Sequence, residues 1–251
     1  MTKKYEKHFL DQVIIRMDFP ASLNGLAKSL PQNIKKTALS SFPIPEPQKF
    51  IAKELLISKQ ATKEEVKEGT NWIFHSKDKE KTLAITHDHF HIAYKKYESF
   101  NVLKKDFICI LEAMFSEYPK LQSRRLGLRY INEIKVSENN VLDWHEYLDD
   151  NLLTMLKFPK ETKNIARAFN NLILNYEGII LKFQYGMFNP DFPALIRKKI
   201  FILDYDAYYQ GPQDFEEIKQ SIDVFHEKIE SSFESSIKDK LRNLMEIIHN
   251  G

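Results

Sequence analysis

Two apolar stripes with the same spacing, one in each half of the chain, restrict the possible folds more than any other feature of this sequence. The later stripe starts at Phe215 after Asp214 and the earlier one at Phe100 after Ser99, an offset of 215 − 100 = 115 residues. Steps of three and four residues place each stripe on one face of an amphipathic helix, and Asp and Ser are favoured N-caps. The offset pairs Phe100, Leu103, Phe107, Ile110, Met114 and Tyr118 with Phe215, Ile218, Ile222, Phe225, Ile229 and Phe233. This match predicts an internal duplication.

Segments with the alternation of β-strands accompany both helices and follow the same order in each half. Strands are predicted at 13–19, 50–57, 71–76, 82–86 and 89–94, and again at 128–134, 168–176, 179–185 and 200–206. Two further helical segments are predicted at 22–39, split by Pro31, and at 141–156. The expected organisation is therefore a first α+β repeat at 1–120, a second at 121–235 and a C-terminal helical extension at 236–251.

The element order β-α-β(3-4)-α, given twice, predicts the fold class. Strands joined by short turns pair antiparallel, and a sheet with one apolar face needs helices to cover it. We therefore expect an α+β fold with duplicated units that form a curved antiparallel sheet with helices on one face. The order resembles the duplicated TATA-box-binding-protein fold and, more loosely, helix-grip folds, and a resemblance of this kind implies no function.

Composition excludes several classes of protein. With 37 basic and 35 acidic side chains, the net charge of +2 gives no strong overall attraction to nucleic acid or anionic membranes. Cys109 is the single cysteine, which excludes an internal disulfide and a cysteine-based zinc site. The N-terminus lacks the apolar core of a signal peptide, and no stretch approaches the roughly 18 apolar residues of a membrane helix. We expect a cytoplasmic protein, and the absence of Gly-rich phosphate loops, G-x-S-x-G and H-E-x-x-H disfavours the commonest enzyme classes.

The segment R-R-L-G-L-R-Y-I-N, residues 124–132, is the most distinctive in the chain. Together with the later L-D-Y-D-A-Y and F-H-E-K-I-E-S-S-F segments, it resembles an uncharacterised, sporadically distributed prokaryotic family of about this length. The resemblance covers nearly the whole chain. It implies no activity or catalytic residue, and a sporadic distribution is compatible with a mobile-element or anti-phage defence locus.

Alternation along this segment separates core residues from candidate ligand-binding residues. Leu126, Leu128 and Tyr130 fall on the core face, with Arg129 on the other. In a purely structural interpretation Gly127 admits a close neighbour or a bulge, and Asn132 points inward to satisfy buried backbone groups. In a functional one, guanidinium forks bind carboxylate or phosphate. The candidate ligand-binding residues are Arg124, Arg125, Arg129 and Lys182.

Two pairs of titratable residues are candidate metal ligands. His89 and His91 share one strand face, with His87 within reach across a turn, and imidazoles at this spacing can bind zinc or manganese. Asp204 and Asp206 lie at the same 115-residue offset, and paired carboxylates can hold a divalent ion for phosphoryl or nuclease chemistry. The alternative for each pair is an ordinary polar strand face.

The last helix is predicted to continue beyond Phe233 with an apolar stripe that has no counterpart in the first half. The residues of this stripe are Ile237, Leu241, Leu244 and Ile248. Exposed apolar side chains of this size forgo roughly 1.5 to 3 kcal/mol each, so a cover is expected. The cover is either the first repeat or a partner protein, and a homodimer is favoured because one patch can serve both chains across a two-fold axis.

Three functions remain after these exclusions. The leading hypothesis is a non-enzymatic binding or accessory protein that engages a protein or small ligand and needs no cofactor. The first alternative is a hydrolase or nuclease that depends on a divalent metal bound by the two His and two Asp residues. The second is nucleic-acid binding on the open sheet face, for which a salt-dependent affinity would be the signature.

Overall fold

The computed structural model describes residues 4–57 and 62–248, and the chain forms two compact units. The first unit contains residues 1–13, 128–208 and 223–251, and the second contains 14–127 and 209–222. The strands β2 (Leu10–Asp18), β8 (Arg125–Lys135) and β11 (Ile200–Gln210) and the helix α5 (Phe215–Ser236) supply residues to both units. Neither unit is therefore a continuous stretch of the sequence.

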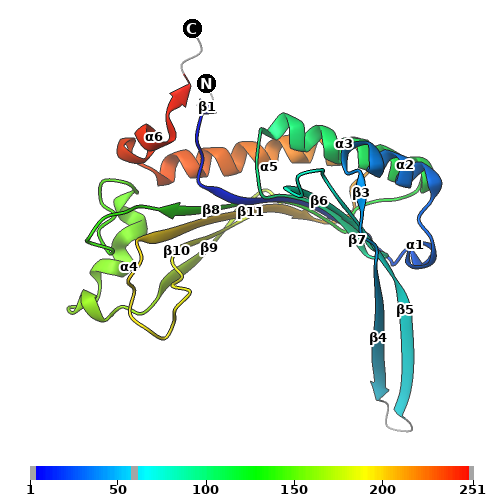
Figure 1. The fold of residues 1–251 in the computed structure, drawn as a ribbon, viewed down its shortest axis with the longest axis horizontal. Coiled ribbons are helices and arrows are strands. Elements are labelled where there is room, and N and C mark those ends of the chain that lie inside the picture. Colours follow the sequence, from blue (N-terminus) through cyan, green and yellow to red (C-terminus); the bar gives the residue numbers. More distant parts are fainter. Residues whose placement is uncertain (1–3, 58–61, 249–251) are drawn as a thin grey trace. The chain divides into compact units, whose positions relative to one another are not determined.

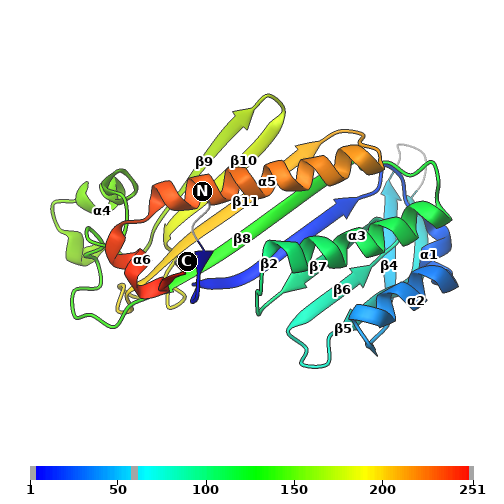
Figure 2. The same ribbon diagram turned by 90° about the horizontal axis from the view of Figure 1, so that it is seen from above.

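The second unit is an antiparallel sheet with its helices on one face (Figures 1 and 2). Its strand order is β3-β5-β6-β7-β2, with β4 paired to β5. The strands are β3 (Ile44–Pro45), β4 (Gln48–Ile57), β5 (Thr62–His75), β6 (Lys81–Ile85) and β7 (His89–Tyr94), and the helices are α1 (Asn24–Lys28), α2 (Gln32–Ser41) and α3 (Phe100–Glu117). Residues 72–75 of β5 pair with β6 and residues 62–71 pair with β4, so that β4 and β5 extend from the sheet as a two-stranded arm (Figure 1).

The first unit has the strand order β8-β11-β10-β9, and α5 lies on one face of these strands (Figure 1). Its other strands are β9 (Ala168–Tyr176), β10 (Ile179–Met187) and the short pair β1 (Lys4–Tyr5) and β12 (Ile247–Ile248). Its shorter helices are η1 (Asp150–Leu153), α4 (Thr154–Lys157), η2 (Thr162–Asn164) and α6 (Asp239–Met245). The predicted class, α+β with an antiparallel sheet and helices on one face, is confirmed.

The two long helices form for the reasons that their sequences indicate. The stripe positions Leu103 and Phe107 of α3, and Ile218 and Phe225 of α5, are fully buried. The Ser99 hydroxyl accepts a hydrogen bond from the amide of Val102, which caps α3. At the start of α5, Asp214 accepts from the amide of Glu217 and the Glu217 side chain accepts from the amide of Asp214. This reciprocal capping box satisfies two backbone donors.

The helix predicted at 141–156 is wrong, since the only α-helix here is α4 (Thr154–Lys157), which overlaps the end of this segment after a short 3₁₀ turn. Two aspartates explain the difference: the carboxylate of Asp143 accepts from the amide of His145, and that of Asp149 from the amide of Asn151. Such local bonds compete with helix formation. The apolar periodicity instead reflects the packing of Trp144 edge-to-face on Phe201.

The predicted continuation of the last helix is also wrong, because α5 ends at Ser236 and α6 begins at Asp239. Ile237, which lies between α5 and α6 in the sequence, forms an antiparallel β-bridge with Leu148. Ile237 and Leu241 are buried by the chain itself, whereas Leu244 is 46% exposed. The side chain of Ile248 lies outside the described residues. At least two of the four residues are therefore covered without a partner, and the homodimer stays a prediction. The duplication and the repeat boundaries at 120 and 235 stay predictions.

Candidate functional site

The face of the second unit's sheet that no described helix covers carries a group of arginine and histidine side chains. On β2, Ile15 and Met17 are fully buried toward the helices, so Arg16 lies on the opposite face. On β7, Phe90 and Ile92 are buried in the same way. His89 and His91 accordingly share one strand face, as the sequence predicts, and this face is the uncovered one.

Asp18 is the centre of this group. The Nε of Arg16 donates to Oδ1 of Asp18 over 2.6 Å, and Nη2 of Arg124 lies 3.7 Å from Oδ2. The side chain of Asp18 is 9% exposed, compared with 42% for Arg16 and 61% for Arg124. One carboxylate thus partly neutralises two guanidinium groups, whose outer edges remain in contact with solvent.

The two histidines stack beside this cluster, with ring centroids 5.5 Å apart and an interplanar angle of 16°. Burial, followed by the positive charge of Arg16, lowers the pKa of His89 to about 4, although Asp18 and Asp88 oppose the shift. Burial and Arg16 also lower the pKa of His91. Both rings are therefore neutral at pH 7. The buried Nδ1 of His91 has no hydrogen-bond partner among the residues that the structure describes.

Gly127 has the role that alternation predicts, since it admits a close neighbour. A Cβ at this position would lie 2.9 Å from Nη1 and 3.3 Å from Cζ of Arg125. The guanidinium of Arg125 therefore folds across the strand at Gly127. Because Leu126 and Leu128 on either side of Gly127 are fully buried, Arg125 lies on the uncovered face.

The corresponding face of the first unit uses its charges internally. The Nε and Nη2 of Arg129 donate to the two carboxylate oxygens of Asp204 over 2.8 and 2.6 Å. This bidentate bond raises the pKa of Arg129. The predicted ligand-binding residue Arg129 and the predicted metal ligand Asp204 thus bind each other. Asn132 is buried, and its Nδ2 donates to the carbonyl of Leu203, which confirms the predicted structural role.

The other predicted site residues are divided between the two units. Arg124, Arg125, His89 and His91 belong to the second unit, and Arg129, Lys182, Asp204 and Asp206 to the first. His87 stacks on Phe50, with ring centroids 5.5 Å apart. In residues 4–57 and 62–248, no three His, Cys, Asp or Glu side chains lie where they could hold a metal ion. Sequence reasoning missed Arg16 and Asp18, although their i, i+2 spacing on a strand was a usable signal.

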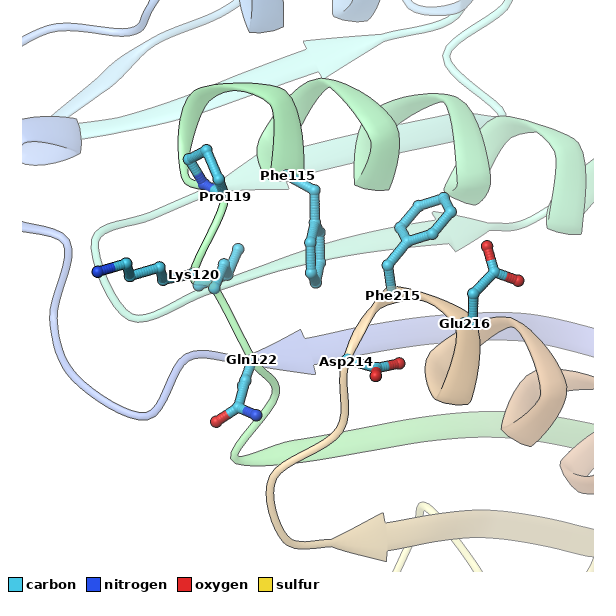
Figure 3. Close-up of a pocket in the computed structure, with 8 residues that line it drawn as sticks. Phe115, Pro119, Lys120, Gln122, Asp214, Phe215 and Glu216 are labelled. Atoms are coloured by element: carbon cyan, nitrogen blue, oxygen red, sulfur yellow. The ribbon is translucent and has the colours of Figure 1, made fainter.

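A shallow groove lies in the second unit between the end of α3 and the start of α5 (Figure 3). Its volume is about 470 Å³, and Phe115 and Phe215 line it with ring centroids 5.4 Å apart. Lys120, Asp214 and Glu216 lie around it. Asp214 is occupied as the cap of α5 and Glu216 pairs with Lys219, so the groove presents few polar groups that are not already engaged.

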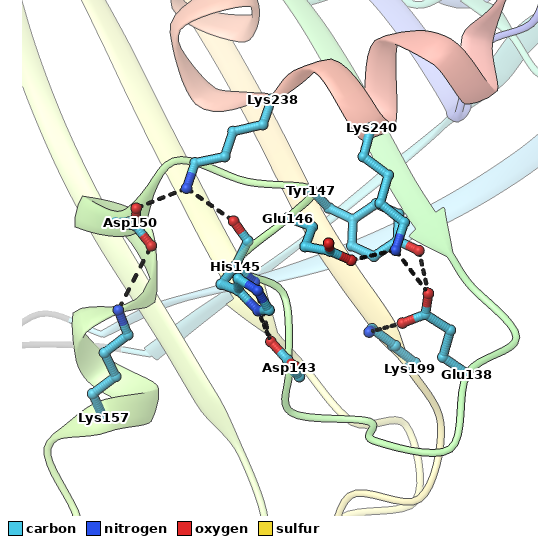
Figure 4. A network of polar contacts seen from close by, with 10 residues as sticks. All are labelled: Glu138, Asp143, His145, Glu146, Tyr147, Asp150, Lys157, Lys199, Lys238 and Lys240. Atoms are coloured by element: carbon cyan, nitrogen blue, oxygen red, sulfur yellow. Dashed lines mark hydrogen bonds and ion pairs between the residues drawn. The ribbon is translucent and has the colours of Figure 1, made fainter.

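A second polar cluster, in the first unit, has a structural role (Figure 4). Glu138 accepts from the buried ammonium of Lys199, from the Tyr147 hydroxyl and from Lys240. These bonds, with that of Lys199 the largest contribution, lower the pKa of Glu138 to about 2. Lys199 also lies 5.2 Å from the ring centre of Trp144. The cluster holds the segment after β8 against β11 and α6.

Comparisons with known proteins assign this chain to no family. No family model matches the chain, and no curated protein matches it. Among solved structures, it is similar to Methanococcus jannaschii TBP, with 7% identity and a TM-score of 0.27 over 90% of this chain and 99% of that one. A likeness at this level carries no functional argument. No helix among the described residues has the length and apolar character to cross a bilayer.

Proposed function

We propose that this chain is a non-enzymatic binding protein that holds an anionic group, such as a phosphate or carboxylate, on the uncovered sheet face of its second unit. The observation that carries the proposal is the pair Arg16 and Arg124, whose side chains stay 42% and 61% exposed although both contact the carboxylate of Asp18. Arg125 lies on the same face. Asp88, at the turn before β7, is engaged by Ser22. The solvent-exposed guanidinium groups of Arg16 and Arg124 are suited to bidentate binding of oxyanions.

The histidines support the same class of ligand. Burial and the positive charge of Arg16 lower the pKa values of His89 and His91, so both imidazoles stay neutral at pH 7. The positive charge on this face therefore comes from the arginines. An anion bound beside Arg16 would offset this field and accept a hydrogen bond from an imidazole N–H. Neutral stacked rings also offer a flat surface to an aromatic or sugar group attached to the anion.

A long nucleic-acid track receives less support. Such a track needs a run of cations for successive phosphates, whereas Arg129 in the first unit is held by Asp204 and Asp206 adds negative charge nearby on the same strand. The metal-dependent alternative loses the carboxylate of Asp204 to that same bond. A small anionic ligand, or one acidic group of a partner, fits these charges better.

The test is titration calorimetry of the full chain with inorganic pyrophosphate at low and high salt. We expect binding that weakens with salt and falls about tenfold in Arg124→Ala, the loss of one charge-assisted hydrogen bond. Lys160→Ala, which removes an exposed cation of the first unit, is the control and should bind as the original chain does. Absence of binding, or equal losses in both variants, would refute the proposal.

Two further measurements separate the alternatives. Affinity for single-stranded oligonucleotides that rises steadily with their length would replace the small ligand with nucleic acid. A divalent metal that copurifies with the protein, together with hydrolysis of a phosphodiester, would show that the non-enzymatic proposal is wrong.

A further inference from the structure

A loop of the first unit presents large apolar side chains to solvent, at a distance in sequence from every residue of the proposed anion site. Phe188, Phe192 and Leu195 are 50%, 52% and 48% exposed. Scattered exposed apolar residues are ordinary, but several within one short loop mark an interaction surface. We call residues 188–196 the Phe188 loop.

The Phe188 loop has an ordered backbone, built around Asn189. The Nδ2 of Asn189 donates to the carbonyls of Ala166 and Ala194 over 2.8 and 2.7 Å, and its Oδ1 accepts from the amide of Asp191. Asn189 adopts φ = 53°, a left-handed conformation that Asn tolerates better than most residues. The aromatic side chains are thus held in place before any partner binds, which reduces the entropy lost on association.

Arg167 gives this surface a specific polar group. Its guanidinium carbon lies 4.3 Å from the ring centres of both Phe188 and Phe192, so the two rings contact it by its faces. Its Nε donates to the carbonyl of Phe188 over 2.7 Å. The two Nη atoms of Arg167 have no hydrogen-bond partner among the described residues. Their N–H bonds lie in the plane of the guanidinium and are directed away from its edge. A guanidinium held in this way is prepared for a carboxylate.

The surrounding charges favour an acidic partner. Around the Phe188 loop, Arg167, Arg197 and Lys198 carry positive charge and Asp191 carries negative charge, a balance of 3 − 1 = +2. Asp191 forms an ion pair with Lys198 over 3.2 Å. Its negative charge is therefore engaged by Lys198 and not by Arg167 or Arg197.

We propose that the Phe188 loop and Arg167 form a docking surface for a partner protein that presents a carboxylate beside an apolar pocket. Phe188, Phe192 and Leu195 fill the pocket and Arg167 binds the carboxylate. Aromatic and arginine side chains are the residue types that contribute most to such interfaces. A discrete carboxylate suits the fixed edge of Arg167 better than a diffuse anionic lipid surface does.

The test uses a phage-displayed library of random peptides selected against the full chain, followed by affinity measurements on synthetic copies of the enriched peptides. We expect enriched sequences to combine Asp or Glu with neighbouring apolar residues. Their affinity should fall about tenfold or more in Phe192→Ser, and also in Arg167→Lys, which keeps the charge but loses the planar fork. Phe158→Ser removes a phenylalanine that is exposed elsewhere in the same unit and is the matched control, with no change expected.

Several outcomes would overturn this proposal. Enrichment of peptides without acidic residues, equal affinity for all the variants, or no enrichment at all would each do so. Binding of vesicles that contain phosphatidylserine, lost in Phe192→Ser while no peptide is enriched, would assign the loop to a lipid surface instead. All substituted residues are exposed, so unchanged melting temperatures verify that the variants are folded.

Discussion

The uncovered sheet faces of the two units carry the same kinds of residue and use them differently. In the first unit, the Nε and Nη2 of Arg129 both donate to the carboxylate of Asp204, a residue that is 6% exposed. In the second, Arg16 and Arg124 share the single carboxylate of Asp18 and remain 42% and 61% exposed. The difference teaches that an arginine on a sheet face indicates ligand binding only when its own protein leaves part of the guanidinium unpaired.

The largest expected effect concerns the phase of β8, on which this comparison of faces depends. Tyr130 is 6% exposed on the helix-covered face, and truncation of a buried aromatic side chain costs roughly 3 to 5 kcal/mol. Tyr130→Ala should therefore lower the free energy of unfolding by that amount in urea titrations. A loss no larger than that of an exposed arginine variant would mean that the faces of β8 are assigned the wrong way round.

A smaller effect separates the arginines of the two units. Alternation alone predicts that Arg129→Ala leaves the fold intact, but the structure shows that this change leaves the Asp204 carboxylate buried and unpaired. We now expect a loss of about 1 to 3 kcal/mol in unfolding free energy, and a loss within about 0.5 kcal/mol for the exposed Arg124→Ala.

The double variant Arg129→Ala with Asp204→Asn completes this test. Since it removes the unpaired charge, it should recover part of the stability lost in Arg129→Ala. If Arg124→Ala and Arg129→Ala destabilise the chain equally, the contrast between the faces fails.

Buried histidines in both units make stability depend on pH. Burial and Arg16 lower the pKa of His89 to about 4, and burial lowers that of His226 to about 4 against the opposing charge of Asp223. Between pH 6.5 and 4 the unfolded chain binds more protons than the folded one, so the free energy of unfolding should fall as the pH falls through this window. His89→Asn and His226→Asn should each flatten the pH profile of melting temperature.

Repeating these pH profiles of melting temperature with added pyrophosphate compares the histidines of the two units. If it binds beside Arg16, it should favour protonation of His89 and reduce the slope that remains in His226→Asn. It should reduce the slope that remains in His89→Asn by less, because only His91 then feels the bound anion. Equal responses in the two variants would place the anion elsewhere.

The smallest expected effect is that of Gly127→Ala. The new Cβ would meet the end of the flexible Arg125 side chain, which can move, so unfolding free energy should change by less than about 1 kcal/mol. The displaced guanidinium should nevertheless alter pyrophosphate affinity in calorimetry. Unchanged affinity would remove Arg125 from the proposed site.

Local pattern predicted those parts of the molecule that depend on neighbours in sequence. Strand β7 and the stripes of α3 and α5 follow from periods of two and 3.6 residues, and the inward position of Asn132 follows from alternation. The bond between Arg129 and Asp204 joins residues 75 apart, and it depends on how β8 pairs with β11, which one sequence does not specify.

The segment around Trp144 failed for a related reason. Its apolar residues have helical spacing, but they serve contacts with distant residues such as Phe201 and Lys199. Tertiary packing and the two aspartate turns outweighed a weak helical preference. The proposed anion site was partly visible, since Arg124 and Arg125 were identified, while Asp18 became meaningful only once its partners were known.

The way in which β2, β8, β11 and α5 are divided between the units has a consequence for the time course of folding. The second unit begins at residue 14 and is not complete until residue 222 has been synthesised, so an N-terminal part of the chain cannot finish folding while the ribosome makes the rest. Contacts between residues this far apart in sequence also form slowly, because a long loop must close before they stabilise anything. During synthesis, Phe115 of α3 therefore lacks its ring partner Phe215, 5.4 Å away between centroids in the folded chain, until the start of α5 has been made.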